Sequence, residues 1–368
     1  MENTEEKKES KGKKVLDYII KTMNGMAYGL FSTLIIGTII GTIGKFFNEG
    51  SYVANVLGGV ANFLKNLTGV GIGVGIGLSL KFDGLKLISI GAAGGIATYM
   101  AGTWSINPET GAIEQFNYTN FGFKIGDPLT VYVVVIAICL LIPLVLRKKT
   151  PVDIIIVPLF TIVAALVTTL LICMPISWLT TVVGAFINKA TELHPFIMGI
   201  IIAVLMGMAL TAPISSAAIA ASFRIAGLAG GAAVVGCCVQ MLGFAVMSRK
   251  DNKIGTVISI GIGTSMLQFK NIVRKPIIWL PTIIVSAILG PVTTCLFKTL
   301  CTSNGAGMGT SGLVGIFGVI DEAAMGSSLS VWLLNVGLGL VVLPIVLVYI
   351  VDFVFRRFNL IKEGDLVV

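Results

Sequence analysis

Long runs without a charged residue constrain this chain more than any other feature of its sequence. Thr22 to Gly44, between Lys21 and Lys45, is one such run of 23 residues, long enough for a helix to cross a hydrocarbon core of ~30 Å. Only 12% of the chain is charged, against roughly 25% in an ordinary soluble domain. The sequence therefore predicts an all-α polytopic membrane protein. Further long runs are 87–108, 128–146, 154–188, 195–223, 225–248, 276–297 and 323–351.

The distribution of Lys and Arg predicts which segments are cytoplasmic. Basic residues are dense in 1–21, at 147–149 and at 356–362, whereas the segment 105–127 has one Lys and three acidic residues and is expected outside. Both termini are therefore expected in the cytoplasm. The basic segment 249–253 should be cytoplasmic too, but counting spans from residue 147 brings it there only if one apolar stretch turns back.

Two apolar stretches contain residues that interrupt a helix. Met208 to Ala221 contains Pro213 and a pair of serines, and Ser303 to Ser328 is rich in glycine. Non-helical backbone at membrane depth is tolerated only where protein or a water-filled cavity satisfies it, and interrupted helices often form transporter binding sites. We expect two re-entrant hairpins among about ten spanning helices; the alternative is a kinked helix and an outside loop. The candidate lining residues here are Pro213, Ser215, Ser216, Gly309, Thr310 and Ser311.

Polar residues inside the apolar runs are the remaining binding candidates, because they are costly to place in a membrane. Asp321 and Glu322 lie between two uncharged runs, and a carboxylate there could accept hydrogen bonds from sugar hydroxyls or hold a cation. His194 is the single histidine and stands where an apolar run begins. Each has a structural alternative: a charge or imidazole at the membrane interface, or an amide that joins two helices. The amide candidates are Gln240, Gln268 and Asn271.

Several reaction classes lack the residues they need. The six cysteines form no C-x-x-C motif, there is one histidine, and no phosphate-binding G-x-x-x-x-G-K-[ST] loop occurs. We therefore expect no metal site, no cofactor and no catalytic site in this chain. The Lys and Arg residues that make the chain basic mostly flank membrane segments, and in the lysine-rich tail they alternate with glutamates. A nucleic-acid partner is therefore not expected.

Two other segments are ambiguous by pattern. Glycine alternates with apolar residues from Gly69 to Gly77, a period typical of a strand, but an open strand cannot lie in lipid, so close helix packing is the better interpretation. The segments 51–67 and 175–193 mix apolar and polar residues and could be interfacial helices.

Six motifs carry a resemblance to a known family. They are G-D-P-L from Gly126, P-V-D-I-I-I-V-P from Pro151, M-G-M-A-L-T-A-P-I-S-S-A-A from Met206, G-C-C-V-Q-M-L-G-F-A-V-M-S from Gly236, G-T-S-M-L-Q from Gly263 and G-M-G-T-S-G-L-V-G from Gly307. In these stretches the chain resembles the enzyme IIC-like membrane proteins of the sugar phosphotransferase system, within the subgroup that includes the perfringolysin O regulator.

The resemblance implies a homodimer with about ten spanning helices, two re-entrant hairpins and a substrate-binding half that moves against a dimerising half. In typical enzyme IIC proteins a Gly-Ile-Thr-Glu motif supplies a carboxylate to the sugar. Here Gly318-Val319-Ile320-Asp321-Glu322 stands at a similar place with a different sequence. Glu322 is accordingly the expected main acceptor, and any phosphoryl donor is expected on a separate IIB protein.

The sequence divides into a charged cytoplasmic tail at 1–21, a scaffold and dimerisation half at 22–193, a substrate-binding half at 194–351 and a cytoplasmic tail at 352–368. The expected function is transport of a small polar solute, a sugar above all, across a bacterial cell membrane by alternating access. Two alternatives stay open: a membrane sensor that signals through its tail, and a transporter driven by a proton or sodium gradient.

Overall fold

The computed structural model is mainly helical. The residues that it describes are 11–44, 46–48, 50–82, 84–103, 105–106, 113–114, 128–146, 150–212, 214, 216–323 and 333–368. Within these ranges, extended pairing is confined to a two-residue antiparallel ladder in which Ser105 faces Glu114, together with a single bridge between Gly227 and Cys301. The predicted all-α class is confirmed.

The first half of the chain contains α1 (Lys11–Leu30), η1 (Phe31–Ile35), α2 (Ile36–Gly44), α3 (Tyr52–Asn66), α4 (Thr68–Ser79), α5 (Gly84–Thr103), β1 (Ser105–Ile106), β2 (Ile113–Glu114), α6 (Pro128–Val145) and α7 (Asp153–Ala190). The second half begins with α8 (Pro195–Thr211), α9 (Ser216–Ser222), α10 (Gly227–Met247), η2 (Ser248–Lys250), α11 (Ile254–Ile258), η3 (Ser259–Gly263), η4 (Ser265–Gln268) and α12 (Phe269–Arg274). It continues with η5 (Pro276–Trp279), α13 (Leu280–Pro291), η6 (Val292–Phe297), α14 (Ser303–Ala306), η7 (Ser311–Leu313), α15 (Val314–Ala323), η8 (Leu333–Val342) and α17 (Leu343–Arg357).

Seven helices in the described residues are long and apolar enough to cross a membrane. They are 17–44, 84–101, 128–145, 153–173, 227–250, 276–297 and 333–357. Four shorter apolar helices accompany them, at 68–79, 195–211, 254–263 and 311–320. The polytopic membrane architecture is therefore confirmed, although several of the about ten expected spans are short or interrupted helices.

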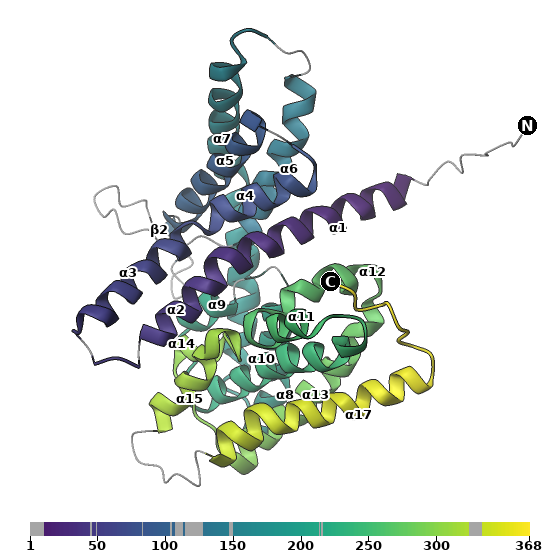
Figure 1. Ribbon diagram of the computed structural model, residues 1–368. Coiled ribbons are helices and arrows are strands. Elements are labelled where there is room, and N and C mark those ends of the chain that lie inside the picture. The colour runs from purple at the N-terminus through teal and green to yellow at the C-terminus, as the bar shows by residue number, and fades with distance from the viewer. Residues whose placement is uncertain are drawn as a thin grey trace, which may run out of the picture.

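The first half packs around the glycine-rich α4, which is helical as predicted. A Cβ atom at Gly25 of α1 would overlap the backbone of Gly75, and one at Gly94 of α5 would overlap the carbonyl of Gly69. The absence of side chains thus lets α1 and α5 approach α4 on two sides. In Figure 1, α4 lies between α1 and the group formed by α5, α6 and α7.

Helix α7 is one continuous element of 38 residues that passes through Pro158 and Pro175. At 1.5 Å per residue it is about 57 Å long, well beyond the hydrocarbon thickness. The segment 175–193, which the sequence left open as an interfacial helix, is mostly the second part of this long helix. Prolines are tolerated in such helices because neighbouring groups satisfy the freed carbonyls.

The second half is built around α10, which is surrounded by protein. Of the most apolar part of the span 227–250, 89% is buried, and α8, α13, α14 and α17 all contact α10. Figure 1 shows α17 along the outer edge of this group, with the chain returning from it towards α12. Because α7 also contacts α8 and Ala27 of α1 joins the cluster around α10, the boundary at residue 193 stays a prediction.

Candidate functional site

Two helix interruptions meet against α10. Helix α8 ends at Thr211 and α9 begins at Ser216, and the hydroxyl of Ser216 donates a 2.7 Å hydrogen bond to the carbonyl of Gly307 in the second interruption. On the α10 side, a Cβ atom at Gly309 would lie 2.7 Å from the carbonyl carbon of Cys237. Gly309 also has a φ of +53°, which favours glycine. The two segments that the sequence singled out are therefore neighbours.

The hydroxyls of the second interruption bind backbone in η3. Thr310 Oγ1 donates to the carbonyl of Gly261 at 2.5 Å, and Ser311 Oγ donates to that of Gly263 at 2.8 Å. Both side chains are buried. Since η3 ends at Gly263, its last carbonyls have no partner further along the helix, and these hydroxyls satisfy two of them.

A cluster of buried polar side chains lies beside the first interruption, and we call it the Gln240 cluster: Thr211, Gln240, Ser265, Trp279 and Thr282. Gln240 Oε1 accepts three hydrogen bonds, from Thr211 Oγ1 at 3.1 Å, Trp279 Nε1 at 3.0 Å and Thr282 Oγ1 at 3.0 Å. Thr211 Oγ1 also lies 2.9 Å from Ser265 Oγ. The cluster joins α8, α10, η4, η5 and α13.

The amide nitrogen of Gln240 has no hydrogen-bond partner in the part of the chain that the structure describes. Turning the amide over would not cure this, because the indole N–H of Trp279 can only donate and so requires the oxygen at its side. Gln240 is 0% exposed, and a buried unpaired donor costs about 1–3 kcal/mol. The nitrogen is therefore an unsatisfied donor, buried beside the first interruption.

Gln268 and Asn271 lie elsewhere, facing the C-terminal segment. Gln268 Nε2 donates to the carbonyl of Leu366 at 2.9 Å, and Asn271 Nδ2 donates to that of Val367 at 3.0 Å. Asn271 also donates to Gln268 Oε1 at 2.7 Å. Both amides are occupied by protein groups of the C-terminal segment, which is neither the ligand contact nor the helix-to-helix bond that the sequence suggested for them.

His194 is also separate from the cluster. It is the N-cap of α8, where Nδ1 accepts from the amide of Phe196 at 3.4 Å, and its side chain is exposed. Asp321 and Glu322 belong to α15, which follows directly from the second interruption, but their side chains lie outside what the structure describes. Pro213 and Ser215 lie outside the described residues altogether.

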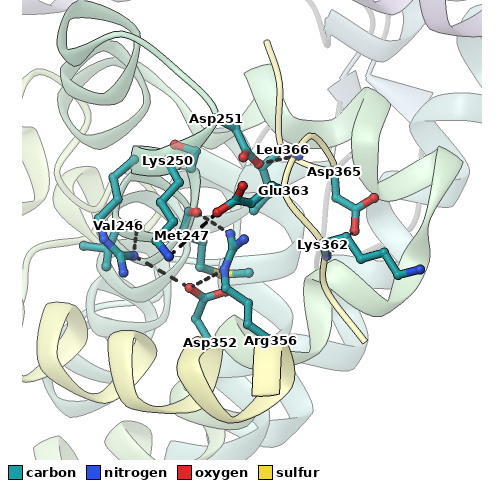
Figure 2. Close-up of polar contacts among 12 residues, drawn as sticks. Val246, Met247, Lys250, Asp251, Asp352, Arg356, Lys362, Glu363, Asp365 and Leu366 are labelled. Atoms are coloured by element: carbon teal, nitrogen blue, oxygen red, sulfur yellow. Dashed lines mark hydrogen bonds and ion pairs between the residues drawn. The ribbon is translucent and has the colours of Figure 1, made fainter. Parts of the chain in front are cut away.

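Charged residues concentrate where α10 ends and α17 ends. Both oxygens of the buried Asp352 accept from Arg356 Nε at 3.0 Å, and Arg356 Nη2 donates to the carbonyl of Met247 at 2.8 Å. Figure 2 shows Asp352 and Arg356 reaching from α17 towards Met247, with Glu363 and Leu366 of the C-terminal segment nearby. These contacts fasten α17 to the end of α10.

The C-terminal segment carries a carboxyl with a lowered pKa. Burial alone would raise the pKa of Asp365, but hydrogen bonds from Lys275 Nζ at 2.5 Å and from the amide of Lys362, with the charges of Lys275 and Arg356, bring that pKa below its usual value. The carboxylate form of Asp365 is therefore favoured by the folded protein.

A pocket of about 420 Å³ opens at the start of α1 and is lined by Lys14, Asp17, Tyr18, Lys21, Ser79, Leu80 and Lys81. It shares no residue with the Gln240 cluster. Among the described residues, no three His, Cys, Asp or Glu side chains gather as a metal site would require.

Sequence reasoning missed Thr211, Ser265, Trp279 and Thr282 as members of the polar cluster. Thr211 and Ser265 stand inside motifs that were singled out, and for Thr211 the position beside the first interruption was an available signal. Trp279 and Thr282 reach Gln240 from 39 and 42 residues away in the chain, and nothing local marks them.

Comparisons with known proteins agree with the motifs. The sequence model of the family described as "Phosphotransferase system, EIIC" matches residues 20–368. No curated protein matches significantly. A crystal structure of the transporter ChbC, the IIC component from the N,N'-diacetylchitobiose-specific phosphotransferase system, matches at 15% identity with a TM-score of 0.35, over 95% of this chain and 97% of that one. A structural likeness at that score adds nothing about this chain, whereas the family match includes both interruptions and α10.

Proposed function

The chain belongs to the phosphotransferase system EIIC family, and on this premise we propose that it moves a small polar solute, a sugar, across the membrane by alternating access. The family match covers nearly the whole chain, so the proposal applies to the molecule and not to one segment of it. The membrane is proposed to be the bacterial cell membrane, with both termini in the cytoplasm.

The observation that supports a binding site in the second half is the unpaired amide nitrogen of Gln240 beside two helix interruptions. A sugar hydroxyl can accept from that nitrogen and donate to a carboxylate in turn. We propose Glu322 as the main carboxylate acceptor, with Asp321 beside it, and backbone groups at 212–216 and 309–311 as further contacts. Alternating access would then consist of movement of the two interruptions relative to α10.

Phosphoryl transfer, in this proposal, takes place on a separate IIB protein that meets the cytoplasmic side. The chain's own residues bind and release the sugar, and none of them accepts the phosphoryl group. A homodimer is proposed as the working assembly.

A thermal-shift screen of the purified full-length protein against sugars, sugar phosphates, nucleosides and vitamins tests the proposal. A ligand that binds only the folded state must raise the melting temperature, because at one hundred times its dissociation constant it increases the free energy of unfolding by about 2.7 kcal/mol. We expect a free sugar to stabilise the wild type and the Glu192→Gln control, whose carboxyl is exposed beside His194, but not Glu322→Gln. Stabilisation by non-sugar metabolites alone would contradict the sugar assignment.

A further inference from the structure

The segment Lys362–Val368 is bound through its backbone by side chains from another part of the chain. Asp251 accepts two amides, that of Gly364 at 3.0 Å and that of Leu366 at 3.1 Å. Asn252 donates to the carbonyl of Leu366 at 2.7 Å and accepts the amide of Val368 at 2.9 Å. Gln268 and Asn271, described above, donate to the same main chain. These four side chains bind the backbone of the segment by hydrogen bonds, as the edge of a sheet binds an added peptide.

Two side chains of the segment also contact the rest of the protein. Leu366 is 0% exposed, although it lies within three residues of the last one. Asp365 pairs with Lys275 at 2.5 Å. We call the receiving residues the tail cradle: Asp251, Asn252, Gln268, Asn271 and Lys275. Figure 2 shows Asp251 close to Leu366.

The tail cradle shares the single turn η4 with the Gln240 cluster. At one end of η4, Gln268 binds the C-terminal segment; at the other end, Ser265 contacts Thr211. Thr211 in turn donates to Gln240. Leu366 is thus connected to the Gln240 side chain through the Gln268 hydrogen bond, the backbone of η4 and the hydrogen bonds of Ser265 and Thr211.

We propose that Lys362–Val368 is an intramolecular ligand of the tail cradle that positions η4 and, through Ser265, the Thr211 and Gln240 side chains. The segment is a positioning element: it fixes η4, and η4 in turn positions the Gln240 cluster. The expected effect of the segment on sugar affinity rests on the proposed function. Its expected effect on the order of η4 and Thr211 does not.

Matched variants of the full chain compare side chains of the segment that contact the rest of the protein with neighbouring side chains that are exposed. Leu366→Ala removes the buried side chain, and Val367→Ala is its control because Val367 is 47% exposed. Asp365→Asn weakens the short pair with Lys275, and Glu363→Gln is its control because the Glu363 pair with Lys250 is 3.9 Å long and its side chain is 78% exposed. The measurement is backbone hydrogen exchange, with sugar affinity as a second readout.

We expect Leu366→Ala to accelerate exchange about tenfold at 264–275 and at the end of α8 near Thr211, with Asp365→Asn acting in the same direction and both controls close to the wild type. Exchange in α5 should stay unchanged, which distinguishes release of the segment from general destabilisation. An excess of a synthetic peptide with the sequence of residues 358–368 should restore protection in Leu366→Ala, and any weakened sugar affinity with it.

Acceleration that stays within 358–368 and leaves η4 and Thr211 unchanged would overturn the inference. Should the wild type bind no sugar, the proposed function fails, but the exchange at η4 and Thr211 still supports or overturns the positioning role.

Discussion

Gln240 has one side-chain oxygen that accepts three donors and one nitrogen that meets none among the described residues. Such an arrangement costs free energy in a core as long as the nitrogen has no hydrogen-bond partner, so it calls for an explanation. Position in the sequence indicated only that an amide stands in an apolar run, with helix-to-helix bonding as an equal alternative. The structure shows that the same residue does join helices through its oxygen, while its nitrogen has no partner among the described residues.

At Asp365 we predict a pH-dependent contribution to stability. Because the folded protein lowers the pKa of this carboxyl, its stabilising effect is fully present above the unfolded value of about 3.9 and is lost as the pH falls through the lower folded value. Melting temperatures of the wild type and Asp365→Asn should therefore differ at pH 7 and be equal at a pH below the lowered pKa of the folded protein. An equal difference at both pH values would contradict the lowered pKa.

Among the elements, α4 illustrates what a pattern can and cannot specify. Alternating glycine and apolar residues favoured close helix packing over a strand, because a strand edge cannot be left in lipid, and α4 is helical. Its partners α1 and α5 could not be identified from the pattern, because a smooth glycine surface accepts any neighbouring helix. The same holds for α7, whose continuation through Pro175 depends on its neighbours.

Two alanine substitutions in helices should have opposite effects. In Gly25→Ala the new methyl group would overlap the backbone of Gly75, so α1 and α4 must separate, at a cost of about 1–3 kcal/mol. In Gly59→Ala of α3 the methyl group meets nothing within 4 Å, and the higher helix propensity of alanine should stabilise by about 0.5–1 kcal/mol. Unfolding in denaturant measures both; two losses of similar size would contradict the close α1–α4 contact.

On the scale of the whole molecule, the sequence predicted the polytopic helical class and both interrupted segments, because charge and glycine or proline content are local properties. It could not place Gln268 and Asn271, whose partners Leu366 and Val367 are 98 and 96 residues away. Nor could it assemble the Gln240 cluster, which draws on five elements. Contacts of this range depend on how helices are arranged, and composition carries little information about that.

Uptake of a labelled sugar into proteoliposomes that contain the full chain tests the central claim most directly. The sugar is the one that the thermal-shift screen identifies. Gln240→Glu removes the unpaired N–H donor and keeps an oxygen that can accept from Thr211, Trp279 and Thr282. We predict saturable uptake by the wild type, with affinity reduced at least about tenfold in Gln240→Glu, the factor that corresponds to about 1.4 kcal/mol for one lost hydrogen bond. No uptake of any stabilising sugar by the wild type would contradict transport, and unchanged affinity in Gln240→Glu would contradict the proposed site.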